Sequence, residues 1–335
     1  MEIVLTAKDL TVGYSRKGSE DSVVQSNLNL QLHAGELTSL MGQNGAGKST
    51  LIRSLAGFTK PLGGEVFVQS RPIRSHSEKE LSKQIAVVLT ENLSQVSLTV
   101  SELVSTGRYP YTGFFGRLSA HDRRIVWESL VAVGIGHFAG KLLSELSDGE
   151  RQKAMVAKAL AQETPIIVLD EPTAFLDLPS RIEMMQLLHR LATERHKAIL
   201  LSTHDLEQAL RFSDTIWLID GDKQVECGSP EDLLLHGEIM KFFGRDGIVF
   251  DDLSGTFRAE NTACCEVELI GEGIIRHWVA NALYRNGFIP SAQHNLPICI
   301  EIKPGIPTEF ILSKPDSSPV KMMSVESLMR ELRAS

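Results

Sequence analysis

The sequence of 335 residues has no apolar run long enough to cross a lipid bilayer, and its first residues lack the basic start and apolar core of a signal peptide. It also has no long basic tract, and 34 Lys and Arg residues against 42 Asp and Glu residues give a formal net charge of −8. An acidic chain without such a tract is a poor candidate for binding nucleic acid directly. We therefore expect a cytosolic protein that contacts a membrane only through a partner.

Cysteine is scarce, and Cys227, Cys264, Cys265 and Cys299 show no C-x-x-C spacing. Reduced thiols are the expected state. Cys264 and Cys265 are adjacent, so on a strand they would point to opposite faces, which disfavours a metal site there. Internal repeats and low-complexity segments are also absent, and the length allows a large domain plus a smaller one.

A glycine-rich segment at 42–50 matches the phosphate-binding pattern G-x-x-x-x-G-K-[ST] at every fixed position. Residues 36–41 before it predict a buried strand, and residues 49–56 after it predict a helix whose positive end would face a phosphate. Lys48 is expected to reach the terminal phosphates, and Ser49 to place its hydroxyl on Mg²⁺. An ordinary glycine-rich turn is the alternative. The predicted ATP-binding residues of the segment are Gly42, Gln43, Asn44, Gly45, Ala46, Gly47, Lys48, Ser49 and Thr50.

Two further apolar runs end in polar residues. Residues 166–169 predict a strand buried on both faces, and Asp170 and Glu171 follow it. We expect Asp170 to hold Mg²⁺ and Glu171 to orient or deprotonate the attacking water. His204 follows a second such strand at 200–203 and is expected to hydrogen-bond the γ-phosphate. Each pattern alone is also compatible with a buried strand that runs into a turn.

Before both of these runs, the segment 146–152 reads Leu-Ser-Asp-Gly-Glu-Arg-Gln and precedes a stretch with helical spacing. Ser147 can cap that helix, and Glu150 three residues later completes a capping box. By itself the segment predicts only the start of a helix.

In their order along the chain, these segments resemble those of the ATP-binding cassette (ABC) ATPases. The resemblance implies an α/β fold, that of a P-loop NTPase with a helical subdomain, and hydrolysis of ATP with Mg²⁺ by a homodimer. It implies that Ser147 and Gly149 face the ATP of the partner copy, that Tyr14 stacks on adenine and that Asp177 lies at the dimer interface. Catalysis would then rest on Glu171, with His204 and Lys48 on the phosphates.

The chain departs from the family at two positions. The first of the two glycines that usually follow the signature serine is replaced by Asp148. The family also carries a glutamine after the strand that 85–89 resembles, where this chain has Glu91. A carboxylate can still bind Mg²⁺, so Glu91 joins Ser49 and Asp170 as a predicted ligand. Gln95 is the alternative for that role.

The stretch 107–110 reads Gly-Arg-Tyr-Pro and resembles the ATPase subunits of importers for iron-siderophores, haem and cobalamin. A loop with Tyr109, Tyr111, Phe114 and Phe115 is a possible docking surface for the membrane partner, and a shielded corner of the core is the alternative.

The importer interpretation implies integral-membrane permease subunits, a periplasmic or lipoprotein substrate-binding protein, and a place at the cytoplasmic face of the cell membrane. The alternative function is a soluble ABC ATPase that remodels a cytosolic macromolecule, with the C-terminal part as its targeting module.

The cassette is predicted over residues 1–245, with its helical subdomain at about 81–140. A Gly- and Asp-rich boundary at 243–255 precedes a small α/β accessory domain at 256–335, for which a regulatory or dimer-stabilising role is a hypothesis. His277 and His294 in this domain are expected to be surface residues. The expected apolar face of its first helix comprises Ile274, Ile275, Trp278, Val279, Ala282 and Leu283.

Overall fold

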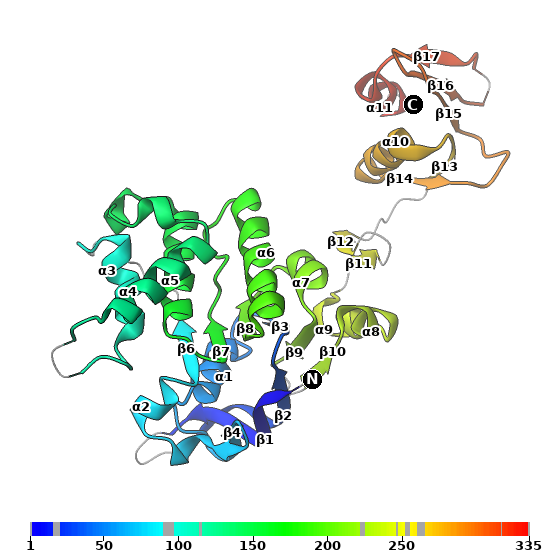
Figure 1. Ribbon diagram of the computed structural model, residues 1–335. Helices are drawn as coiled ribbons and strands as arrows, with labels where there is room; N and C mark the ends of the chain where they lie inside the picture. The colour runs from blue at the N-terminus through cyan, green and yellow to red at the C-terminus, as the bar shows by residue number, and fades with distance from the viewer. Residues whose placement is uncertain are drawn as a thin grey trace. The chain divides into compact units, whose positions relative to one another are not determined.

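The structure is a computed structural model (Figure 1). It describes residues 2–15, 21–89, 97–113, 116–221, 225–245, 247–251, 255–259, 265–315 and 317–333. The chain divides into two compact units, one running from the N-terminus to Gly244 and the other from Phe257 onward. Both units contribute to the segment between them, which holds a two-stranded sheet of β11 (Ile248–Asp251) and β12 (Thr256–Ala259).

The first unit contains a six-stranded sheet in the order β10-β9-β3-β8-β7-β6. The pairs from β9 through β6 are parallel, and β10 runs antiparallel to β9. Every residue of β3, β7 and β8 is buried, as expected for parallel strands covered on both faces. The strands are β3 (Leu37–Gly42), β6 (Ile85–Val88), β7 (Ile166–Leu169), β8 (Ala198–Thr203), β9 (Thr215–Ile219) and β10 (Val225–Gly228).

An antiparallel sheet of the same unit has the order β2-β1-β4-β5 and packs its apolar face into the core around the phosphate loop. Alternate residues of its long strands are buried, because side chains on a strand point to opposite faces. The strands are β1 (Ile3–Tyr14), β2 (Ser22–His33), β4 (Gly63–Val68) and β5 (Arg71–Pro72).

Helices α3, α4 and α5 pack against one another beside β6 (Figure 1). Each begins at a capping box, formed by Thr99 and Glu102, by Ser119 and Asp122, and by Ser147 and Glu150. The helices of this unit are α1 (Lys48–Leu55), α2 (Glu78–Leu81), α3 (Val100–Ser105), α4 (Ala120–Ala132), α5 (Asp148–Ala161), α6 (Leu178–Arg195), α7 (Leu206–Phe212), α8 (Pro230–Leu235) and α9 (Glu238–Phe243). Short 3₁₀ turns are η1 (Ile73–Ser75), η2 (Thr106–Arg108), η3 (Gly136–Phe138) and η4 (Leu143–Glu145).

The second unit is a five-stranded sheet with two helices, which confirms the predicted α/β accessory domain. Its order is β14-β13-β15-β16-β17, and β13 runs parallel to both β14 and β15. The elements are β13 (Cys265–Ile270), α10 (Gly273–Arg285), β14 (Phe288–Ser291), β15 (Cys299–Lys303), β16 (Glu309–Ser313), β17 (Val320–Met322) and α11 (Val325–Arg333).

The predicted apolar face of α10 is wrong at two of its six positions. Val279, Ala282 and Leu283 are buried in the core, but Ile274 is 73% exposed and Trp278 is 62% exposed. These two residues are four apart and share a side of the helix that the sheet and α11 leave uncovered. Among the described residues, no helix has the length and apolar character needed to span a bilayer.

The core of the second unit gives a stability prediction. Leu283 is fully buried, so Leu283→Ala should lower the free energy of unfolding of this unit by about 2–5 kcal/mol. Hydrogen exchange read by mass spectrometry should show faster exchange in α10, α11 and β13, with β3 and β7 unchanged. The control Trp278→Ala should leave exchange unaltered. Equal acceleration in both units would contradict the assignment of Leu283 to a separate core.

Candidate nucleotide-binding site

Three glycines of the phosphate loop are required by its backbone conformation or by its close packing. Gly45 and Gly47 have φ angles of +87° and +96°, which side chains disfavour. A Cβ atom at Gly42 would lie 2.3 Å from the carbonyl oxygen of Ile219 on β9. One at Gly47 would lie 2.3 Å from a methyl group of Val24. The loop therefore needs glycine both for its turn and for its close packing between β3 and α1.

Lys48 lies inside this loop and is only 6% exposed. Its Nζ atom donates hydrogen bonds to the carbonyl oxygens of Gly42 at 2.9 Å and Gln43 at 3.2 Å. Burial lowers the pKa of Lys48, and the nearby carboxylates of Glu171 and Asp170 partly offset that effect. A buried ammonium group gains from further negative charge, so the position suits the terminal phosphates of a nucleotide.

The predicted carboxylates lie at the adjacent end of β7, where Ser202 of β8 joins them. The Ser202 hydroxyl donates to Asp170 Oδ1 at 2.6 Å and accepts from the backbone N–H of Glu171 at 2.9 Å. His204 Nδ1 lies 3.8 Å from Glu171 Oε1. Glu171 has a φ angle of +49°, a costly conformation for a residue with a side chain and one that clusters at functional sites.

Oxygen ligands are available for a magnesium ion in this region. Asp170 supplies a carboxylate at the end of β7, and the exposed Ser49 supplies a hydroxyl in the first turn of α1. Both are the hard oxygen donors that Mg²⁺ prefers, so the chemistry of the residues fits the ion. Glu91 and its alternative Gln95 lie outside the described residues.

Tyr14 ends β1 and reaches the phosphate-loop helix through its hydroxyl, which lies 2.9 Å from Thr50 Oγ1. Its side chain remains 54% exposed, so the ring borders the loop without being buried in the core. Stacking on a base needs such an accessible ring, and the contact of Tyr14 with adenine stays a prediction.

The signature segment occupies the start of α5. Ser147 caps the helix by accepting from the N–H of Glu150 at 3.3 Å, and Glu150 Oε2 accepts from the N–H of Ser147 at 2.8 Å. Hydrogen bonds from the backbone N–H and the hydroxyl of Ser147 to this carboxylate lower the pKa of Glu150. Asp148, the departure from the family pattern, pairs with Arg151 at 2.7 Å. The additional carboxylate is thus partly neutralised by its own helix.

Gly149 and Asp177 both lie beside Ser180, near the start of α6. A Cβ atom at Gly149 would lie 3.2 Å from Ser180 Oγ, and the Asp177 side chain accepts from the N–H of Ser180 at 3.2 Å to cap α6. Hydrogen bonds from Ser180 lower the pKa of Asp177. Within the described residues, no hydrogen bond or ion pair joins Ser147, Gly149 or Asp177 to the phosphate loop of the same chain.

Two residues that the sequence did not single out support the site. Ser202 is a polar residue inside an apolar strand, two positions before His204, which is a signal that the sequence contains. Gln25 is fully buried, and its Nε2 atom donates to the Ala46 carbonyl of the phosphate loop at 2.8 Å. Nothing in the local sequence distinguishes Gln25 from other polar residues of β2.

Comparison with known proteins agrees with this geometry. The ABC transporter family profile matches residues 25–174, and the iron ABC transporter C-terminal domain profile matches residues 264–333. A petrobactin import ATP-binding protein of Bacillus anthracis is 38% identical over 258 residues, covering 76% of this chain and 92% of that protein. The iron(3+)-hydroxamate import ATP-binding protein of Bacillus subtilis is 34% identical over 266 residues, covering 79% and 96%.

The chain belongs to the ABC transporter family. Like its relatives, it is an ATP-binding subunit that hydrolyses ATP. The ABC ATPases of importers act as dimers with membrane permease partners.

Solved ABC structures share the fold. One component of an ABC transporter complex from Clostridium perfringens aligns with a TM-score of 0.62 and 28% identity, over 72% of this chain and 94% of that one. A dimeric bacterial ABC transporter cassette aligns with a TM-score of 0.57 and 29% identity, over 68% of this chain and 98% of that one.

The bridging hydroxyl of Ser202 gives a prediction for this ABC ATPase. Ser202→Ala removes the hydrogen bonds to the predicted Mg²⁺ ligand Asp170 and to the Glu171 backbone. We expect the Mg²⁺ requirement of ATP hydrolysis to rise about 10- to 100-fold, as for other partners of metal ligands, while ATP binding persists. A titration of ATPase rate against Mg²⁺ measures this.

The matched control is Ser129→Ala in α4, because the Ser129 hydroxyl bonds only within its own helix. An unchanged Mg²⁺ dependence in Ser202→Ala would contradict the role given to the hydroxyl.

Proposed function

We propose that this ABC ATPase powers import of an iron-siderophore, haem or cobalamin-type substrate through a separate permease. The observation that carries the proposal is the relationship to import subunits over about three quarters of the chain. These relatives are named for petrobactin, iron(3+)-hydroxamate, ferric enterobactin and cobalamin. The match of residues 264–333 to an iron-transporter domain and the Gly-Arg-x-Pro stretch point the same way.

We propose that two copies face each other head to tail around two ATP molecules. Lys48, Ser49 and Tyr14 of one copy would hold a nucleotide that Ser147 and Gly149 of the other copy complete. The backbone N–H groups of the phosphate loop and the start of α1 would bind the phosphates, because a glycine-rich loop and a helix start both attract anions. Mg²⁺ held by Ser49 and Asp170, with Glu91 as a further ligand, would neutralise phosphate charge.

Hydrolysis would proceed at the carboxyl end of β7. Glu171 would accept a proton from the attacking water, and His204 would donate a hydrogen bond to the γ-phosphate. Ser202 would hold Glu171 in place through the backbone N–H of that residue. Phosphoryl transfer needs mainly positioning and charge stabilisation, which these groups and Lys48 can supply.

A cycle of dimer closure and opening follows from an ATP site that is built from both copies. ATP would join the two copies because each nucleotide contacts both, and hydrolysis would release them. The helical part that contains α3 and α4 would pass this motion to the permease. We place the complex at the cytoplasmic face of the cell membrane, with a periplasmic or lipoprotein substrate-binding protein as the remaining partner.

A trapped dimer tests the mechanism. Glu171→Gln should bind ATP but fail to activate water, so it should remain a dimer of about 74 kDa under saturating Mg-ATP, twice the 36.9 kDa chain. Light scattering coupled to size exclusion measures this. Glu183→Gln, on the exposed side of α6, is the matched control. A monomer under these conditions would contradict the composite site.

A pull-down tests the transport assignment. Tagged Glu171→Gln protein should retain a polytopic membrane protein from detergent-solubilised membranes of its own host when Mg-ATP is present. Lys48→Ala, which removes the buried ammonium group, should lose ATP affinity and this ATP-dependent retention. Recovery of a cytosolic macromolecule in place of a membrane protein would favour the soluble remodelling ATPase.

A further inference from the structure

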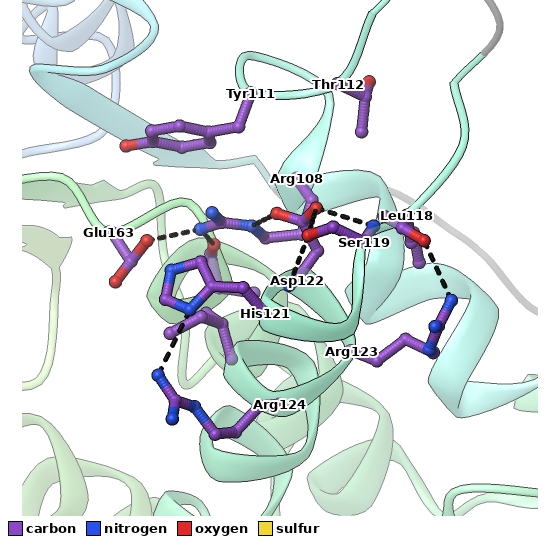
Figure 2. A network of polar contacts seen from close by, with 12 residues as sticks. Arg108, Tyr111, Thr112, Leu118, Ser119, His121, Asp122, Arg123, Arg124 and Glu163 are labelled. Atoms are coloured by element: carbon purple, nitrogen blue, oxygen red, sulfur yellow. Dashed lines mark hydrogen bonds and ion pairs between the residues drawn. The ribbon is translucent and has the colours of Figure 1, made fainter.

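The helical part contains a buried cation that donates three hydrogen bonds. Arg108 is 2% exposed at the end of η2. Its Nε atom donates to Asp122 Oδ1 at 2.9 Å, and its Nη1 atom donates to the Ala161 carbonyl at 2.7 Å and to Glu163 Oε2 at 2.6 Å (Figure 2). One side chain thereby joins the start of α4 to the connection between α5 and β7.

Tyr111 makes a second attachment to the same connection. Its ring lies over the Arg108 guanidinium at 4.1 Å (Figure 2). Its hydroxyl donates to the Gln162 carbonyl at 3.0 Å. Stacking on an aromatic face is a contact that arginine makes well. Three consecutive residues, Ala161, Gln162 and Glu163, are therefore held by Arg108 and by Tyr111, which directly follows the Gly-Arg-x-Pro stretch.

Gly107, which precedes Arg108, allows η2 and α5 to approach each other closely. A Cβ atom at Gly107 would lie 2.3 Å from the Lys158 carbonyl oxygen of α5. Gln162 extends the attachment to the six-stranded sheet, since its Nε2 atom donates to the carbonyls of Ser82 at 2.6 Å and Ile85 at 3.2 Å. The corner at 161–163 is thus bound to η2, α4 and the start of β6 together.

This corner lies between two elements that carry site residues. α5 has 14 residues, so it extends about 21 Å from the corner to its cap Ser147. β7 begins three residues after Glu163 and leads directly to Asp170 and Glu171. A movement of the corner would therefore displace α5, which carries the signature segment, and β7, which leads to Asp170 and Glu171.

The chemistry of the cluster exceeds what packing alone requires. A buried ion pair costs desolvation free energy, and an apolar side chain can often fill such a site with equal or greater stability. Here Asp122 stays ionised, because hydrogen bonds from the Ser119 hydroxyl and backbone, and then from Arg108, lower its pKa to about 2. The charged hydrogen bonds fix the orientation of the Arg108 side chain relative to α4 and the corner, which apolar packing would not do.

We propose that Arg108 and Tyr111 are positioning residues that fix the 108–112 segment to the α5–β7 corner, so that movement at the permease contact is transmitted to Ser147 and Glu171. This inference rests on the proposed function and on the predicted docking loop, whose Tyr109 is exposed. Of the other predicted members of that loop, Tyr111 packs on Arg108, and Phe114 and Phe115 lie outside the described residues. Arg108 and Tyr111 themselves contact neither ATP nor water in this scheme.

The test compares the isolated chain with the chain in complex with its membrane partner. Arg108→Lys keeps the charge but loses the forked geometry, and Tyr111→Phe removes only the hydroxyl bond to Gln162. The full-length variants are purified alone and, through a tag, with the permease from host membranes. Arg124→Lys is the matched control, because Arg124 is an exposed arginine of α4 paired only with its own helix.

We expect the ATPase rate of each isolated variant to stay within about twofold of the unaltered chain. In the complex, the rate should differ from that of the unaltered complex by at least about fivefold, which is the lower range of coupling between sites. The control should match the unaltered protein in both settings. Tyr111→Phe keeps every Arg108 ion pair, so it remains informative if Arg108→Lys folds poorly.

Equal changes in the isolated chain and in the complex would overturn the inference, since they indicate only a structural role. No change in either setting would overturn it as well. If the unaltered chain recovers no membrane partner, the proposed function itself fails, and the inference falls with it.

Discussion

The parallel alignment of β3, β8 and β7 is the constraint on which the site depends. Met41 pairs with Thr203, and Leu169 pairs with Leu201, so the ends of all three strands meet at one edge. Residues more than 100 positions apart are thereby placed beside the phosphate loop. The register also explains the two hydrogen bonds of Ser202. This residue lies opposite the first residue after β7, so its hydroxyl can reach both the Asp170 carboxylate and the Glu171 backbone.

The sequence predicted the parts of this arrangement that local patterns encode. The phosphate loop, the buried strands and the capped start of α5 follow from fixed spacing, apolar runs and capping chemistry, and the α/β fold class was confirmed. The supporting contacts of Gln25 and Arg108 were not predicted, because a hydrogen bond between distant segments leaves no local signal. Helical spacing also grouped Trp278 with the core of α10, since periodicity does not say how much of a face its neighbours cover.

Helix α5 connects Asp148, which departs from the family pattern, with the corner at 161–163. At its start, Asp148 replaces a family glycine, but Arg151 pairs with it and also donates to the Leu146 carbonyl, so the added charge stays within the helix. At its end, the corner at 161–163 is held by Arg108 and Tyr111. Both ends are fixed by charged hydrogen bonds, so the helix is suited to move as one body between nucleotide and permease.

Mixing two inactive variants tests the central claim, that each ATP site is built from two chains. Lys48→Ala disables one half of the site and Ser147→Arg the other, so each variant alone should be inactive. An equal mixture should recover about a quarter of the unaltered ATPase rate, because half of the dimers are mixed and each mixed dimer has one intact site of two. A mixture as inactive as its components would contradict the head-to-tail dimer, and full activity of Ser147→Arg alone would contradict the role of the signature segment.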